Sequence, residues 1–399
     1  MAKYTKRQNP KGWGDATKLV RGGLDRSLHG ETSEAIYLTS GYVYDDPETA
    51  ERRFAGEEDG YVYGRYGNPT VSMLEERMRL LEGAEACYAV ASGMSAAFGA
   101  LACQLKVGDH VVASRSLFGS NYQIITAILP KFGITYDLVD GRDASAWKQA
   151  MKPQTKCVFF ETPSNPLLEV LDIQMICDIA HKAGAVAIVD NVFATPILQK
   201  PMQLGADIVF YSSTKHTDGQ GRVFGGAILC SKKFKEELLK PFLRHTGPTL
   251  SPFNAWVLLK GLETLKLRVE AQSRAAAAVA EALASTKGVE RIYYPHHDTH
   301  AQVKLARGQM KMGGTMVSFD VAGGKAKAFD VLRKLGIIDI SNNLGDAKSL
   351  ITHPATTTHR NIGPEARAMM GITDGNLRLS VGLEDVDDLV GDLRQALKP

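Results

Sequence analysis

Short apolar runs recur along the first two thirds of this chain, each bounded by turn-forming residues. Runs of this length are typical of strands buried in a sheet whose two faces are covered. They lie at 86–91, 111–112, 157–160, 186–189, 208–211 and 227–230. Before and between these runs, apolar residues recur at helical spacing, most clearly in 69–82 and 172–183. The segment 95–105 is a further helix candidate, rich in small residues. Strands alternating with helices predict a mostly parallel sheet covered by helices.

The arrangement of apolar and polar residues divides the chain into three parts. Residues 1–66 show no clear amphipathic repeat and are rich in Tyr, Gly and charge, so we expect an extended N-terminal arm. The alternating pattern defines a large α/β domain at 67–256. From Ser251 the sequence predicts one long helix or two consecutive ones. Short strands and a closing amphipathic helix then indicate a smaller α+β domain at 257–399.

Composition narrows the classes of partner. The 399 residues include 47 Lys plus Arg and 44 Asp plus Glu. The net charge is therefore small and does not favour binding to nucleic acid or to an anionic membrane. The five cysteines are widely spread and include no C-x-x-C pair, as expected for reduced core thiols. The first 15 residues contain no apolar stretch of a signal peptide, and no later run approaches the roughly 20 apolar residues that cross a bilayer. We therefore expect a cytoplasmic protein acting on small molecules.

The segment 205–226 carries the most specific chemistry. It opens with the strand candidate 208–211, after which Ser212, Ser213 and Thr214 place three hydroxyls beside Lys215. Burial disfavours the charged form of a lysine, so an amine just past a buried strand is suited to act as a nucleophile that forms a Schiff base. A solvated loop with an ordinary lysine is the alternative, and the remaining strand ends decide between the two.

Ligands of covered parallel sheets bind at the carboxyl ends of the strands. Gly93 and Met94 follow one strand candidate and open a helix, whose free N–H groups and positive dipole end favour an anion such as phosphate. Asp190 ends another, where a buried carboxylate can meet a cationic ring nitrogen. Together with Lys215, these residues predict a phosphate socket, a carboxylate and an amine nucleophile at one edge of the sheet.

Several blocks of the chain resemble one enzyme family in order and spacing. They are Tyr63-Gly-Arg65-Tyr-Gly-Asn-Pro-Thr, Ser92-Gly93-Met94, Glu161-Thr-Pro-Ser-Asn165-Pro, Val189-Asp190-Asn, Ser212-Ser-Thr214-Lys215, Leu344-Gly-Asp-Ala-Lys-Ser-Leu and Arg378-Leu-Ser-Val-Gly-Leu-Glu. This set is similar to the γ-family of pyridoxal-phosphate enzymes of cysteine and methionine metabolism. The resemblance implies the aspartate-aminotransferase type of fold and a homotetramer built from close dimers.

The same resemblance implies roles for individual residues. Pyridoxal 5'-phosphate is expected on Lys215, with Asp190 facing the pyridine nitrogen. Four residues are expected to hold its phosphate: Gly93, Met94, Ser212 and Thr214. Tyr63 and Arg65 would reach the phosphate of a neighbouring subunit, Asn165 would lie near the ring hydroxyl, and Arg378 would grip the substrate α-carboxylate in a bidentate fork.

Three positions depart from the usual pattern of that family. Phe118 stands where most members carry a Tyr that stacks on the cofactor, so the stacking face is kept and the phenol is lost. His216 follows the lysine where a Tyr is usual, and Asn343 precedes Leu344-Gly345 where a Ser is usual. These departures resemble the O-succinylhomoserine sulfhydrylase branch, which makes homocysteine from an acylated homoserine and sulfide. Cystathionine γ-synthase and methionine or cystathionine γ-lyase remain the alternatives, and a non-catalytic cofactor-binding protein is a further one.

A cluster of metal-ligand residue types follows Pro295. His296, His297, Asp298 and His300 fall within one turn, yet no second cluster elsewhere completes a zinc site. We expect structural or solvated histidines there and no metal.

Overall fold

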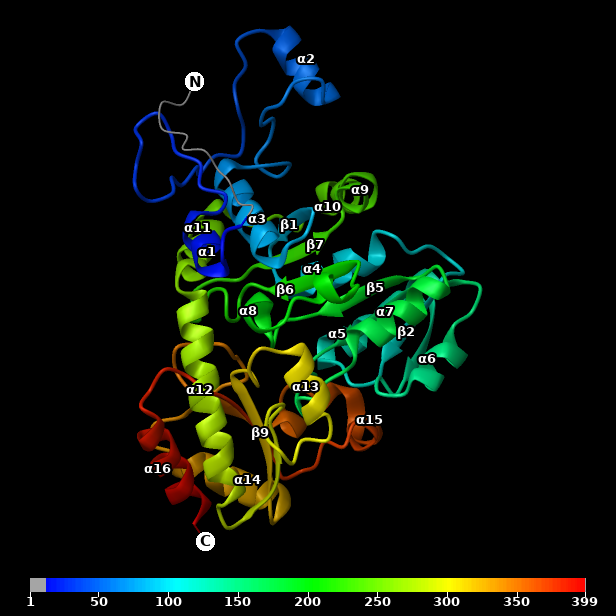
Figure 1. The fold of residues 1–399 in the computed structure, drawn as a ribbon. Coiled ribbons are helices and arrows are strands. Elements are labelled where there is room, and N and C mark those ends of the chain that lie inside the picture. The colour runs from blue at the N-terminus through cyan, green and yellow to red at the C-terminus, as the bar shows by residue number, and fades with distance from the viewer. Residues whose placement is uncertain (1–11, 399) are drawn as a thin grey trace.

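The computed structural model describes residues 12–398 of the chain (Figure 1). Its larger sheet has seven strands in the order β1-β7-β6-β5-β4-β2-β3. The strands are β1 Ala86–Val90, β2 His110–Ser114, β3 Thr135–Val139, β4 Thr155–Glu161, β5 Val186–Asp190, β6 Ile208–Ser212 and β7 Gly226–Cys230. Among these strands, β7 alone runs in the direction opposite to the other six, which confirms the predicted mostly parallel sheet.

Alternate side chains of the strands pack on opposite faces of this sheet. Phe160 and Val189 lie in the core beneath α3 and α7, whereas Phe159 and Ile188 lie in the core beneath α4. The helices of this part are α3 Pro69–Glu82, α4 Gly93–Ala102, α5 Gly119–Gln123, α6 Ala144–Ala150, α7 Ile173–Lys182, α8 Thr195–Leu198, α9 Lys232–Phe234 and α10 Lys240–Thr246. Both faces are therefore covered, which explains why the strands are apolar without alternation.

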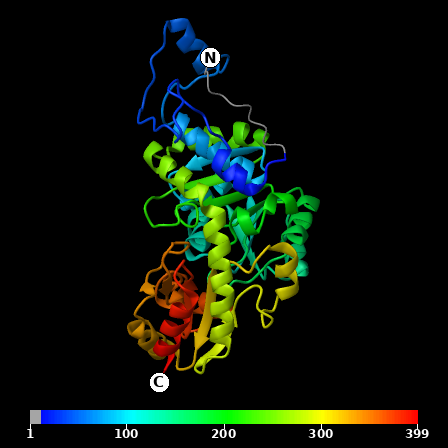
Figure 2. The ribbon, with the colours of Figure 1, turned by 60° about the vertical axis from the view of Figure 1, so that its left-hand side comes forward.

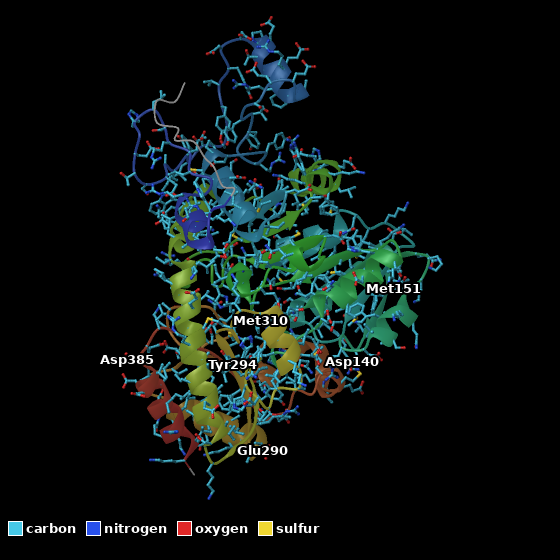
Figure 3. The ribbon with its side chains drawn as sticks, in the orientation of Figure 1. Asp140, Met151, Glu290, Tyr294, Met310 and Asp385 are labelled. Atoms are coloured by element: carbon cyan, nitrogen blue, oxygen red, sulfur yellow. The ribbon has the colours of Figure 1, made fainter. Side chains whose placement is uncertain are left out.

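A smaller α+β domain follows, with five strands in the order β10-β11-β12-β9-β8. Its strands are β8 Val289–Tyr293, β9 Met316–Val321, β10 Asp339–Ile340, β11 Leu350–Thr352 and β12 Asn376–Ser380, and its helices are α13 Val303–Gln309, α14 Gly324–Lys334, α15 Gly363–Met369 and α16 Val386–Leu397. Met310, which follows α13 (Figure 3), packs with Val170 and Ala194 of the large domain. The two domains are thus joined by a small apolar contact as well as by the chain.

Two consecutive helices lead from the large domain to the smaller one. They are α11 Pro252–Glu263 and α12 Leu265–Ala284, separated at Thr264. Figure 2 shows α12 running down from α11 along the smaller sheet. The predicted domain border between residues 256 and 257 falls inside α11, and that border stays a prediction.

The arm contains two helices that the sequence pattern did not predict, α1 Asp15–Arg21 and α2 Pro47–Ala55. The amphipathic signal was missed because α1 is only 7 residues long and α2 buries no side chain. Arg77 of α3 anchors the arm: its guanidinium donates to the carbonyl oxygen of Gly22 at 2.9 Å and pairs with the Glu34 carboxylate at 2.5 Å. No helix among residues 12–398 combines the length and apolarity needed to cross a membrane.

Candidate active site

A cavity of about 270 Å³ opens where the carboxyl ends of β4, β5 and β6 face the smaller domain. Nine of the twelve predicted site residues line it: Gly93, Met94, Phe118, Asn165, Asp190, Ser212, Thr214, Lys215 and Arg378. Residues far apart in the sequence, from 93 to 378, therefore meet around one space.

One corner of the cavity is formed by the N-terminus of α4. Ser92 caps this helix, since its Oγ accepts the Ser95 N–H at 3.1 Å. A Cβ added at Gly93 would lie 2.4 Å from the Ser212 Cβ, so glycine is what lets the helix start this close to the end of β6. Gly93 and Met94 belong to the first turn of α4, so this helix starts two residues before the helix candidate at 95–105. The corner suits an anion with several acceptor oxygens.

Asp190 is a buried carboxylate at the end of β5. It accepts the Val192 N–H at 3.0 Å and the side-chain amide of Asn121 at 2.9 Å. Burial raises the pKa of Asp190 to about 6, and the two hydrogen bonds oppose that rise. A cation placed against this carboxylate would lower the pKa again, so the residue is suited to hold a protonated ring nitrogen.

Lys215 lies just past β6 and is largely buried. Burial, together with the nearby Arg378 guanidinium, lowers the pKa of its amine to about 8. The Lys215 Nζ donates to the Asn343 Oδ1 at 2.6 Å. Asn343 therefore belongs to the site through the lysine, although it does not line the cavity.

The loop after Lys215 is held by contacts from α12 and from the smaller domain. The Arg268 guanidinium of α12 donates to the carbonyl oxygens of His216 and Gly261, both at 2.8 Å. His216 itself is buried, and its Nε2 lies 2.8 Å from the Thr315 Oγ1 of the smaller domain. Gly219 has a φ of +68°, and a Cβ there would lie 2.0 Å from the Arg268 Nη1. The glycine thus makes room for this arginine.

Arg378 is fully buried on β12 and points its guanidinium at the cavity. Its Nη1 donates to the Asn165 Oδ1 at 3.0 Å, and its Nη2 donates to the Asn342 carbonyl oxygen at 2.9 Å. Its Nε finds no acceptor among the described residues. Burial lowers the pKa of Arg378 to about 10, so the group stays charged at neutral pH and can bind a carboxylate.

Two residues of the site were not singled out from the sequence. Glu161, the last residue of β4, and Asn121, on α5, both line the cavity. The signal for Glu161 was its place directly at a strand end, inside a block that the family resemblance included. Asn121 gave no such signal, because its contact with Asp190 joins positions 69 apart in the sequence.

Tyr63 and Arg65 do not line the cavity of their own chain. Arg65 lies against the Tyr66 ring, 4.8 Å from its centroid, and Tyr63 is 42% exposed on the arm. Their predicted contact with a neighbouring subunit stays a prediction.

The histidine cluster after Pro295 makes ordinary contacts. The His300 Nε2 lies 3.0 Å from the Leu168 carbonyl oxygen, and Asp298 pairs with Arg307 at 2.6 Å. Across residues 12–398, no three His, Cys, Asp or Glu side chains are arranged to hold a metal ion.

The chemistry of the cavity fits pyridoxal phosphate. An anion corner at α4, a lysine amine and a buried carboxylate match the phosphate, the aldehyde and the ring nitrogen of that molecule. Within residues 12–398, the Arg378 Nε and the amide oxygen of Asn121 have no hydrogen-bond partner, and both are polar atoms of cavity residues that a bound molecule can satisfy.

Comparison with known proteins defines the class. The family model of pyridoxal-phosphate-dependent enzymes of Cys/Met metabolism matches residues 16–398, so the chain belongs to this family. It is 55% identical to the O-succinylhomoserine sulfhydrylase of Mycobacterium tuberculosis over 394 residues, covering 97% of each chain. It is 40% identical to the L-methionine gamma-lyase of Porphyromonas gingivalis, covering 96% of this chain and 97% of the lyase.

A solved structure agrees with the fold and the cofactor. The Campylobacter jejuni metY structure carries N'-pyridoxyl-lysine-5'-monophosphate and superimposes with a TM-score of 0.93. The two sequences are 32% identical, and the match covers 97% of this chain and all of that one. The protein is therefore a pyridoxal-phosphate enzyme of the aspartate-aminotransferase-like fold.

Proposed function

We propose that this enzyme catalyses a γ-replacement that converts O-succinyl-L-homoserine, or another O-acylhomoserine, and sulfide into L-homocysteine for methionine biosynthesis. One observation carries the proposal: Lys215, Asp190 and Arg378 converge on one cavity in a chain that is 55% identical to a sulfhydrylase over nearly its full length. The lower identity to the methionine gamma-lyase makes lyase activity the second candidate.

The cofactor's place follows from the residues around the cavity. Lys215 would hold the aldehyde carbon, Asp190 the ring nitrogen, and Phe118 one face of the ring. The corner made by α4 and Ser212 would hold the phosphate. Pyridoxal phosphate, when bound, withdraws electrons from Cα of the amino acid. Asp190 supports that function by keeping the ring nitrogen protonated.

Lys215 is the base of the proposed reaction. With a pKa of about 8, a useful fraction of its amine is neutral at the pH of a cell and can take the proton from Cα. The Asn343 side chain accepts from the Lys215 Nζ and so restrains the direction in which the amine points. A second proton transfer, from Cβ, is needed before the acyloxy group on Cγ can leave as a carboxylate.

Arg378 orients the substrate. Its buried guanidinium is held by Asn165 and by the Asn342 backbone, so little conformational entropy is lost when it binds the α-carboxylate. Its unpaired Nε supplies one of the donors. This fixes the position of Cα relative to the Lys215 amine.

Phe118 bears on the choice between replacement and elimination. It lines the cavity without a hydroxyl that could donate or accept a proton. Because Phe118 lacks the phenol, the site has one acid/base group fewer to support elimination to an α-keto acid. Sulfide then adds at Cγ, and homocysteine is the product.

A substrate panel tests this function. Purified holoenzyme is offered O-succinyl-, O-acetyl- and O-phosphohomoserine, each with sulfide, with cysteine or with no nucleophile. We expect homocysteine from the succinyl ester with sulfide as the fastest reaction. Ketobutyrate and ammonia released at a similar rate without a nucleophile would identify a γ-lyase instead, and cystathionine as the main product would identify a synthase.

The proposed assembly is a cytoplasmic homotetramer made of close dimers with shared active sites. It is supported by the exposed arm, on which Tyr63 and Arg65 lie outside the cavity of their own chain. In this arrangement the two side chains bind the cofactor phosphate of a neighbouring copy. Sedimentation measures the assembly, and an Arg65→Ala variant that keeps the same sedimentation but binds the cofactor more weakly supports the shared site.

A further inference from the structure

A second cavity, which we call the interdomain pocket, lies between the large domain and the smaller one. Its volume is about 240 Å³, close to the 270 Å³ of the active-site cavity, and the two cavities share no lining residue. The large domain contributes Arg115, Arg142 and Glu169, and the smaller domain contributes Arg291 and the end of α15. Three arginines thus face a space with room for a small organic molecule.

The two arginines of the large domain are oriented by one carboxylate. The Asp140 Oδ2 accepts the Arg115 Nη2 at 2.6 Å and the Arg142 Nη2 at 2.7 Å, and the Asp140 Oδ1 accepts the Arg142 Nε at 2.9 Å. The Arg142 Nε also lies 3.1 Å from the Glu169 Oε1. These contacts hold both guanidinium groups but leave the Arg115 Nη1 and the Arg142 Nη1 without an acceptor within residues 12–398. Guanidinium groups fixed in this way lose little entropy when they bind a further carboxylate.

Arg291 is the cation on the opposite side of the pocket. It lies on β8 with its Cζ 4.9 Å from the centroid of the Tyr293 ring. A guanidinium that stacks on an aromatic ring keeps its N–H edge free for an acceptor. No carboxylate of the described residues pairs with Arg291, whereas Asp140 and Glu169 balance the two arginines across the pocket. One positive charge therefore remains unbalanced, on the smaller domain.

The wall between the two groups of cations is partly apolar. Leu167, Ile292 and Met369 line the pocket there. A molecule that fits has an acidic group at each end and a short aliphatic stretch between them. Inorganic phosphate has no such stretch and cannot use both ends of the pocket in this way.

The interdomain pocket adjoins two loops of the active site. Ser116 lines it and lies two residues before Phe118, which lines the active-site cavity. Leu167 lines it and lies two residues after Asn165, whose side chain accepts the Arg378 Nη1 at 3.0 Å. A molecule in this pocket would contact both loops and both domains.

We propose that the interdomain pocket is a second binding site, which takes a small dicarboxylate with one acidic group on Arg115 and Arg142 and the other on Arg291, and so links the two domains. Because the two halves of the site belong to different domains, its occupancy favours the arrangement of the domains in which both halves face each other.

Calorimetric titration of the holoenzyme tests the class of ligand. Succinate is the probe, because two methylene groups separate its carboxylates and because it is the acid that the proposed reaction would release. Butyrate, with one carboxylate, and inorganic phosphate are the comparisons. We expect succinate to bind most tightly, and equal affinity for butyrate or phosphate would overturn the assignment to a dicarboxylate. Binding is measured without turnover, so a failed homocysteine assay does not affect it.

Two single variants test the two ends of the site. Arg291→Gln and Arg115→Gln should each weaken succinate binding at least about five-fold, since each removes a charge-assisted contact at a partly exposed group. The matched control is Arg333→Gln. Arg333 lies with its Cζ 6.0 Å from the centroid of the Phe329 ring and does not line the pocket, so this variant should bind as the wild type does.

The two variants also separate this pocket from the active site, where Arg378 can attract carboxylates. Succinate binding that is unchanged in Arg291→Gln would place the anion elsewhere, at Arg378 for example, and would overturn the proposal. A loss in Arg291→Gln with none in Arg115→Gln would show that the ligand does not link the domains, which also contradicts it.

Discussion

The hydrogen bond between Lys215 and Asn343 predicts how fast the apoprotein takes up its cofactor. The Lys215 Nζ donates to the Asn343 Oδ1 at 2.6 Å, and this bond favours the protonated amine. Only the neutral amine attacks an aldehyde. Asn343→Ala removes the acceptor while leaving the backbone oxygen that faces Arg378. We therefore expect the variant to hold more neutral amine than the wild type at the same pH.

The size of the effect follows from the strength of one charge-assisted bond. Its loss at this largely buried amine removes about 1.4 kcal/mol, equal to about one pKa unit. The pKa of Lys215 then falls from about 8 to about 7. At pH 7 the neutral fraction rises from about one tenth to about one half, so incorporation becomes about five-fold faster.

Stopped-flow absorbance after mixing apoprotein with pyridoxal phosphate measures this rate as a function of pH. The matched control is Asn342→Ala, because Asn342 borders the same cavity and its contact with Arg378 runs through its backbone oxygen. We expect the control to keep the wild-type midpoint. A midpoint for Asn343→Ala that is unmoved, or moved to higher pH, would refute the argument.

Three further predictions follow from the geometry. Phe118→Tyr should raise ketobutyrate relative to homocysteine in the assay with sulfide, and an unchanged ratio would rule out the role given to the missing phenol. Gly93→Ala places a Cβ 2.4 Å from the Ser212 Cβ and should weaken cofactor binding at least about ten-fold, the equivalent of about 1.4 kcal/mol. A fluorescence titration with pyridoxal phosphate measures this loss, and in it Gly391→Ala, where nothing lies within 4 Å of the new Cβ, should bind normally. Burial raises the pKa of Glu82 to about 7, so its ionisation in the folded state costs stability as pH rises from about 4.5 to 7. Glu82→Gln should therefore gain up to about 3 kcal/mol in the free energy of unfolding relative to wild type between pH 4.5 and 8, measured by urea denaturation, and a constant difference across that range would disprove it.

The strands were predictable where burial had removed polar residues. The runs that became β4, β5 and β6 are apolar on both faces, and each was located within a few residues. The strand β3 was missed because it lies at the sheet edge and is mostly half-buried, so Thr135–Val139 mixes polar and apolar residues. An edge strand is paired on one side only, and its sequence is correspondingly less restricted.

The site was predictable where residues follow strands, and less so where distant loops meet. The position of Asp190 and Lys215 after neighbouring strands placed both in one cavity. The acceptor that Lys215 finds in Asn343 lies 128 positions away, and no local pattern encodes such a contact. Asn121 was missed as a functional residue for the same reason. Glu161 was not singled out although it stands directly at the end of a strand.

The attachment of Arg268 has a mechanical consequence. This arginine belongs to α12, which packs on the smaller sheet through Ala276 and Val279, while its guanidinium holds the carbonyl oxygen of His216, the residue after Lys215. A movement of the smaller domain together with α12 would therefore displace Arg378 and the loop after Lys215 at the same time. A substrate whose α-carboxylate binds Arg378 and draws the smaller domain inward would then also change the position of the Lys215 amine. Substrate binding and proton transfer would thus be coupled.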